Sequence, residues 1–145
     1  MFGLSNTVRH IGIVVERLDH YADLFCECFD FKVISDQIET GKFIDRLLSL
    51  NDTKIRVVKL RDKKEQVIEL IEFLSEERCE NTVKVYSLGI THIAINVSDI
   101  KLKIQKLVEF DATCVNDPQA NQTSEYLVAY INIGSQVFIE LVQKT

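Results

Sequence analysis

Two histidines and two glutamates stand at matching places in a sequence that repeats itself. Two pairs of stretches match: VRHIGIVVERL (residues 8–18) with ITHIAINVSDI (90–100), and VIELIE (67–72) with FIELVQ (138–143). The repeat makes His10 equivalent to His92 and Glu69 equivalent to Glu140. Two imidazole nitrogens and two carboxylate oxygens suit Zn²⁺, Ni²⁺, Co²⁺, Fe²⁺ or Mn²⁺, because imidazole favours transition metals over Mg²⁺ and Ca²⁺. These four residues are the candidate metal ligands.

Each of these residues has a simpler explanation when it is taken alone. A strand histidine is usually half-buried with its hydrogen bonds satisfied, and a strand glutamate usually faces solvent. The repeat is what favours a site, because two of three histidines and two of twelve glutamates fall at equivalent positions. The remaining histidine, His20, is expected on the surface of the first helix.

Each half of the chain has the pattern of a β-α-β-β-β module. A β-branched run is followed by an amphipathic helix, with Asp19 as the expected N-cap in the first half and Ser98 or Asp99 in the second. The later strands are expected near residues 31–36, 43–60 (two strands divided at 51–52) and 66–73, and near 112–116, 125–133 and 136–142. The first half holds about eleven more residues between its His and its Glu than the second. We assign this insertion to a loop between strands.

Strand alternation predicts which way the candidate ligands point. Side chains alternate across a strand, so each histidine shares a face with a small residue two positions later, Gly12 or Ala94. That face is turned away from the following helix and leaves space beside the imidazole, which favours a cavity. Glu69 and Glu140 have apolar neighbours on both faces of their strands. An ionised carboxylate in such a place must be exposed, protonated, paired or bound to a metal.

Composition and charge exclude several classes of protein. The 145 residues are 46% hydrophobic and 27% charged with a net charge of −5, which is typical of a globular domain. There is no dense basic patch for nucleic acid, and the longest apolar run, residues 126–131, is far shorter than the roughly twenty residues of a membrane span. The N-terminus lacks a secretory pattern, and the four cysteines form no CxxC pair. We therefore expect a cytoplasmic protein with reduced thiols that binds neither nucleic acid nor membrane.

The paired modules resemble a known superfamily. With His in HIGIVV and HIAINV, and Glu in VIELIE and FIELVQ, they look like the vicinal oxygen chelate group of glyoxalases, bleomycin resistance proteins and extradiol dioxygenases. The resemblance covers residues 8–143 and implies an α+β fold. In it, two tandem βαβββ modules, about 6–76 and 87–145, form a curved, cup-shaped mixed sheet with the helices outside, within one domain of residues 1–145. It also implies that His10, Glu69, His92 and Glu140 bind one divalent metal inside the cup. No separate cofactor-binding residues are predicted, and the sequence does not tell whether glutathione or CoA takes part.

The resemblance also implies a class of reaction. Superfamily members with four such ligands include glyoxalase I and methylmalonyl-CoA epimerase, so a lyase or an isomerase/epimerase is expected. The metal, with Zn, Ni or Co favoured over Fe or Mn, would stabilise an enolate or enediolate of a small oxygen-chelating substrate. Glu140, with Glu69 as its counterpart, would move the proton. Arg46 and Arg56 are weaker candidates for holding an anionic group of the substrate.

Two other classes compete with this interpretation. An Fe²⁺ dioxygenase-type member would bind iron through three of the four residues. A non-catalytic small-molecule binding or resistance protein would generally lack the metal ligands, all four of which are present here. The metal content separates these classes. Relatives in the superfamily are commonly dimers, and the chain is therefore expected to form a homodimer.

Overall fold

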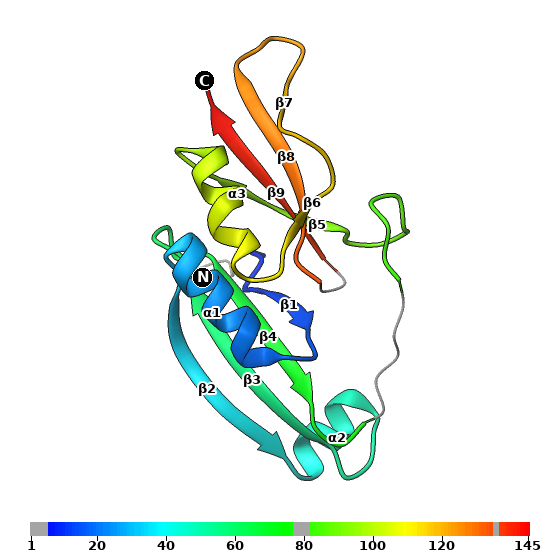
Figure 1. Ribbon diagram of the computed structural model, residues 1–145. Helices are drawn as coiled ribbons and strands as arrows, with labels where there is room; N and C mark the ends of the chain where they lie inside the picture. The colour runs from blue at the N-terminus through cyan, green and yellow to red at the C-terminus, as the bar shows by residue number, and fades with distance from the viewer. Residues whose placement is uncertain (1–5, 77–81, 135–136) are drawn as a thin grey trace. The chain divides into compact units, whose positions relative to one another are not determined.

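The chain folds into two compact units, each with its own mixed sheet (Figure 1). The computed structural model describes residues 6–76, 82–134 and 137–145. Unit 1 comprises Met1–Glu77 and unit 2 comprises Arg78–Thr145. Each unit is α+β, as the sequence predicts. Part of the expected connection between the modules, residues 77–81, lies outside the described residues.

Unit 1 contains a four-stranded sheet whose strands follow the predicted module order. Its elements are β1 (Ile11–Val14), α1 (Leu18–Phe29), β2 (Lys32–Thr40), α2 (Lys42–Leu48), β3 (Lys54–Arg61) and β4 (Val67–Phe73). The spatial order is β1-β4-β3-β2, with β1 parallel to β4 and the other neighbours antiparallel. The first and last strands of the module, which carry the repeated segments, are therefore direct neighbours.

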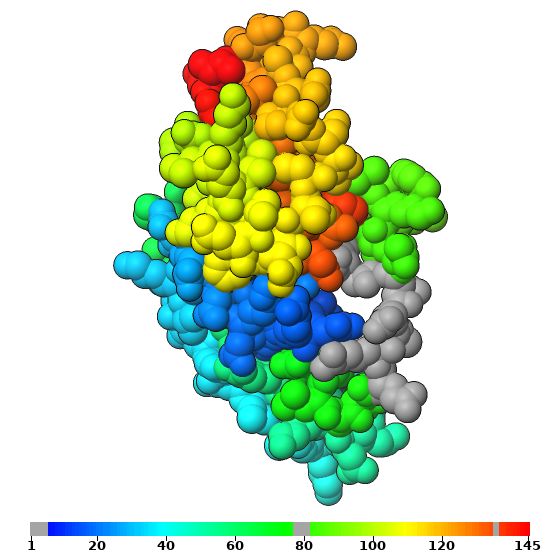
Figure 2. All heavy atoms as spheres, viewed as in Figure 1, coloured from blue at the N-terminus to red at the C-terminus, as the bar shows by residue number. Residues whose placement is uncertain are grey.

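Helix α1 packs on one face of this sheet, where it contacts β3 and β4. Its residues form part of the face of unit 1 that Figure 2 shows. It buries one apolar stripe against the buried sheet residues of the same face, Val58, Leu60, Ile68 and Leu70. Arg17, not Asp19, occupies the N-cap position, and its side chain makes no capping hydrogen bond. Asp19 lies in the first turn instead, where a negative charge favours the helix dipole.

The expected strand at the start of residues 43–60 is wrong, because the chain forms helix α2 there. Phe43–Leu48 holds one β-branched residue, Ile44, and short apolar runs of this kind fit a helix or a strand equally well. Gly41 precedes the helix at φ 96°, a conformation that glycine adopts readily. The helix lies in the connection of residues 41–53, whereas the corresponding connection of unit 2 spans only residues 121–125. The extra length of the first half is thus largely α2 and its flanks.

Helix α2 packs on the sheet face opposite α1. Its buried Ile44 forms a cluster with Ile55 and Val57 of β3, and with the partly buried Ile71 and Phe73 of β4. The register pairs Ile55 with Phe73 and Val57 with Ile71, so all four sheet residues share one face. Glu69, two residues before Ile71, lies on that same face. We call it the Glu69 face.

Unit 2 repeats the arrangement without a counterpart of α2. Its elements are β5 (His92–Asn96), α3 (Ile100–Val108), β6 (Thr113–Cys114), β7 (Gln119–Ala120), β8 (Tyr126–Asn132) and β9 (Phe138–Lys144). The order is β5-β9-β8-β6, with β5 parallel to β9, and β7 also pairs with β8. Strands β6 and β7 together correspond to β2. Pro118 falls between them, and proline has no N–H for the ladder.

Helix α3 is fixed at its start by two side chains. Asp99 is the N-cap and accepts a hydrogen bond from the Leu102 N–H at 2.9 Å, as expected. Gln143 of β9 accepts from the Ile100 N–H at 2.7 Å. Helix α3 contacts β8 and β9. Residues 127, 129, 131, 139, 141 and 143 share the face beneath the helix, so Glu140 lies on the opposite face, which we call the Glu140 face. In the described part of the chain, no helix is both long enough and apolar enough to span a bilayer.

Candidate metal centre

In unit 1, neighbouring parallel strands bring His10 and Glu69 together. His10 directly precedes β1, and β1 pairs with β4 so that Gly12 stands opposite Glu69. Glycine has no side chain to fill the space between the strands. The imidazole two residues earlier therefore reaches across, and its Nε2 lies 3.6 Å from Glu69 Oε1. The Glu69 side chain is only 14% exposed, so its carboxylate is held largely out of water.

Unit 2 builds the same pair by the same means. His92 begins β5, and Ala94 stands opposite Glu140 in the β5–β9 pairing. His92 Nε2 lies 3.1 Å from Glu140 Oε2, and the Glu140 side chain is 22% exposed. The other ring nitrogen, Nδ1, lies 3.3 Å from the Thr91 hydroxyl. A tautomer that donates Nδ1–H to Thr91 leaves the Nε2 lone pair for a metal ion.

A third side chain approaches each carboxylate from the next antiparallel strand. Lys59 of β3 stands opposite Glu69, and its Nζ lies 3.4 Å from Glu69 Oε2. Tyr130 of β8 stands opposite Glu140, and its hydroxyl donates to Glu140 Oε2 at 3.5 Å. The Tyr130 ring also meets the His92 ring edge-on, with centroids 5.2 Å apart. Burial, followed by the charge and hydrogen bond of Glu140, raises the pKa of Tyr130, so the phenol stays protonated.

The two carboxylates are held differently as a result. Glu69 has a partner at each oxygen, His10 at Oε1 and Lys59 at Oε2. Glu140 has both partners at Oε2, and within the described part of the chain its Oε1 has no hydrogen-bond or ion-pair partner. Glu69 thus has a neighbouring side chain at each oxygen, whereas Glu140 keeps one oxygen available to another group.

The donor atoms of each pair suit coordination to a divalent ion. Two ligands bonded to one ion at about 2.0–2.2 Å lie about 3.0–3.5 Å apart when the bonds meet at roughly 90–110°. The His92–Glu140 separation of 3.1 Å falls in this range, and the His10–Glu69 separation of 3.6 Å lies just beyond it. Within residues 6–76, 82–134 and 137–145, no group of three or more His, Cys, Asp or Glu side chains is gathered. Each unit by itself supplies one nitrogen and one oxygen, and the convergence of all four ligands stays a prediction.

Lys59 and Tyr130 are the site residues that the sequence analysis missed. Each precedes the glutamate of its own half by ten residues, which is the spacing that an antiparallel hairpin of this length gives to directly opposed residues. The repeat therefore makes Lys59 and Tyr130 equivalent in position, but their residue types differ. A comparison by residue identity passes over them for that reason.

The arginines proposed for an anionic substrate group do not join the site. Arg56 lies on the α1 side of the sheet, where it binds Asp36 through Nε and Nη2 at 3.0 and 2.8 Å and Asp19 through Nη1 at 2.9 Å. The hydrogen bond from Arg56 lowers the pKa of Asp36, and the bond to Asp36 is the main cause that raises the pKa of Arg56. Arg46 is exposed on α2. Arg56 therefore links α1 to β2 and β3 instead of facing a ligand.

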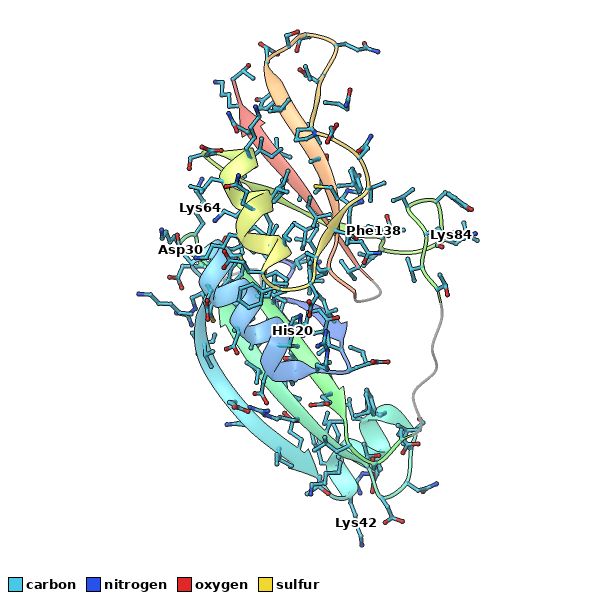
Figure 3. The ribbon with its side chains drawn as sticks, in the orientation of Figure 1. His20, Asp30, Lys42, Lys64, Lys84 and Phe138 are labelled. Carbon is cyan, nitrogen blue, oxygen red and sulfur yellow. The ribbon has the colours of Figure 1, made fainter. Side chains whose placement is uncertain are left out.

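The third histidine and the three described cysteines form no metal-binding group with either pair. His20 lies on α1, as Figure 3 shows, and is half-buried with its ring edge-on to Tyr21, so the expectation of a surface residue is only partly met. Cys28 is buried in the α1 interface, and burial raises the pKa of the half-buried Cys26 and Cys114. Thiols of this kind are poor nucleophiles, and no catalytic role is proposed for them. Cys79 lies outside the described residues.

Two α+β units with equivalent His–Glu pairs define a protein of the vicinal oxygen chelate type. Residues 9–130 match the Glyoxalase/Bleomycin resistance protein/Dioxygenase superfamily. The chain therefore belongs to this superfamily, and the resemblance and fold class predicted from the sequence are confirmed. A comparison with curated protein sequences finds no significant match.

Solved structures of this superfamily share the fold. A glyoxalase family protein from Bacillus cereus superposes with a TM-score of 0.87 at 22% identity, covering 99% of this chain and 97% of that one. A glyoxalase I variant from Zea mays gives 0.65 at 14% identity, covering 94% of this chain and 45% of that one. A variant of the fosfomycin resistance protein FosX from Listeria monocytogenes, in complex with Mn(II) and 1S,2S-dihydroxypropylphosphonic acid, gives 0.63 at 12% identity, covering 98% and 93%.

Proposed function

We propose that the chain is a metal-dependent enzyme that moves a proton on a small oxygen-chelating substrate, as a lyase or an isomerase/epimerase. The observation that carries this proposal is the pair of His–Glu sites at equivalent positions, with donor atoms 3.1 Å apart in unit 2 and 3.6 Å apart in unit 1. His10, Glu69, His92 and Glu140 would hold one divalent metal, with Zn, Ni or Co favoured. When bound, the metal supplies Lewis-acid stabilisation of negative charge on the substrate oxygens.

The contacts of the two carboxylates support different roles for them. A general base needs an oxygen that can come within hydrogen-bond reach of the substrate proton. Glu140 Oε1 meets this requirement, whereas both oxygens of Glu69 are engaged. We therefore assign the proton transfer to Glu140, with Glu69 as its counterpart on the metal. Tyr130 holds Glu140 Oε2 and leaves the other oxygen to act.

Metal analysis combined with a substrate screen tests the proposal. Purified protein loaded with Zn²⁺, Ni²⁺ or Co²⁺ is assayed in deuterated water against 2-oxoaldehyde–thiol adducts and acyl-CoA epimers. We expect metal-dependent incorporation of deuterium at the carbon next to a carbonyl. Oxygen consumption with bound iron would instead indicate a dioxygenase. A chain that binds a small molecule but no metal would indicate a sequestering protein.

We place the protein in the cytoplasm, where its thiols stay reduced.

A further inference from the structure

Lys59 is a charged residue of the candidate site whose chemistry the proposed function does not yet use. Its ammonium lies 3.4 Å from Glu69 Oε2, and its side chain is 34% exposed. Its neighbour in the β2–β3 pairing is Ser35, which is uncharged. In the described part of the chain, Glu69 is the one ion-pair partner of Lys59. The charge is therefore placed beside a candidate ligand by the sheet register, and within the described ranges no other carboxylate pairs with it.

Other cations of unit 1 do not share this position. Arg56 lies on the opposite face of β3 and binds Asp19 and Asp36. Arg61 is on the same face as Lys59, but it pairs with Glu65 at 3.1 Å near the end of the hairpin. In unit 2 the equivalent position, opposite Glu140, holds Tyr130, whose side chain is a phenol and not a cation. Among the described residues, Lys59 is thus the one Lys or Arg that forms an ion pair with Glu69 or Glu140.

This charge alters the electrostatic balance of the proposed centre. Glu69 and Glu140 together carry two negative charges, which a divalent ion neutralises. His10 lies at Glu69 Oε1 and Lys59 at Oε2, so a metal held by His10 and Glu69 would have the Lys59 ammonium beside the same carboxylate. With Lys59 included, the proposed centre would carry a net charge of about +1 by formal counting. The Lys59 side chain is 34% exposed, so water screens its charge in part, and the remaining field favours an anion over a neutral ligand.

We propose that Lys59 makes the metal centre selective for anionic ligands, so that the substrate carries a carboxylate or similar anionic oxygen group beside its chelating oxygens. This inference rests on the proposed function, because it requires a metal bound by Glu69. Lys59 acts on the ligand through its charge. Tyr130, at the equivalent place, positions Glu140 without adding charge.

The test compares anionic and neutral probes on the Co²⁺-loaded full-length chain. Co²⁺ affinity is measured first for each variant by competition with a chelator. Oxalate and imidazole are then titrated while the visible Co²⁺ absorption is followed. The variants are Lys59→Met, Lys59→Gln and Lys59→Arg. Lys54→Met is the matched control, since Lys54 begins the same strand and lies on the opposite face.

Loss of the charge should weaken oxalate binding selectively. We expect the oxalate Kd of Lys59→Met to rise about tenfold or more, with the imidazole Kd changed less than about threefold. Lys59→Arg and Lys54→Met should retain the oxalate affinity of the wild type within about threefold. Lys59→Gln should raise the oxalate Kd as Lys59→Met does. If the methionine variant does not fold, the glutamine variant alone tests the proposal.

Three results would overturn the inference. If both neutral variants bind Co²⁺ and keep wild-type oxalate affinity, Lys59 does not select anions and the proposed function is unaffected. An equal loss of oxalate and imidazole binding would mean that Lys59 only maintains the structure of the site. A wild-type chain that binds no Co²⁺ would overturn the proposed function, and this inference with it.

Discussion

Replacing Glu140 by glutamine separates the proton-transfer role of this residue from its structural role. The substitution nearly preserves the shape of the side chain and keeps one oxygen, but it removes the charge and the base. Glu140 lies on the sheet face opposite the α3 core, 3.1 Å from His92 and 3.5 Å from Tyr130. Buried packing is therefore unchanged, and we expect the free energy of unfolding of the apoprotein to change by less than about 1 kcal/mol.

The expected kinetic effect follows from the two functions that the substitution removes. Disturbing a metal ligand should weaken metal affinity about 10- to 100-fold, which an excess of metal overcomes. Loss of the base should lower the rate at saturating metal about 10²- to 10⁴-fold, or about 3–5 kcal/mol in activation free energy. Of the two candidate glutamates, only Glu140 has an oxygen, Oε1, without a partner among the described residues. Glu69 is therefore not expected to take over as the base.

The assay follows deuterium incorporation into a substrate identified by the screen, using nuclear magnetic resonance at saturating metal. Glu109→Gln is the matched control. It makes the same chemical change at an exposed residue at the end of α3, away from the site. Its rate should equal that of the wild type. If Glu140→Gln binds metal and keeps full turnover, the assignment of the base is wrong.

Two further predictions concern stability and assembly. Arg56→Met should lower the Tm at pH 7 by about 2–4 °C, or about 1 kcal/mol, because it breaks contacts to Asp19 and Asp36 that are partly exposed. The pKa of Asp36 is lowered in the folded state, so this stabilisation is present above the unfolded value of about 3.9 and is lost as the pH falls through the folded value. An equal Tm difference at pH 3 and pH 7 would refute this explanation. We also predict a homodimer, which the exposed Phe43 and Leu47 of α2 would favour; a mass of 16.7 kDa by light scattering at micromolar concentration would contradict it.

The features that depend on strand alternation and on the repeat could be predicted from the sequence. Equivalent segments imply equivalent strands, and alternation places His10 and Glu69 on one face of the sheet and His92 and Glu140 on one face of the other. Gly12 and Ala94 were recognised as small neighbours of the histidines. The structure adds that each stands opposite a glutamate, which explains how the imidazole reaches the carboxylate.

The features that depend on long-range register could not be read in this way. Lys59 and Arg56 are three residues apart on β3 and therefore point to opposite faces, but only the pairing with β4 shows that Lys59 meets Glu69. Helix α2 was missed because its apolar residues lack a diagnostic period over seven positions. The helix packs through Ile44 on Ile55 of β3 and Phe73 of β4. These two strand residues come together only through the β3–β4 pairing.

The stoichiometry of metal binding tests the central claim most directly. Equilibrium dialysis against Zn²⁺ or Co²⁺ is carried out on the wild type, on His10→Ala in unit 1 and on His92→Ala in unit 2. If all four ligands share one ion, the wild type binds one ion per chain, and each substitution weakens binding by at least about tenfold. Two ions per chain would contradict the account. So would retention of wild-type affinity by either variant, because one His–Glu pair would then be dispensable.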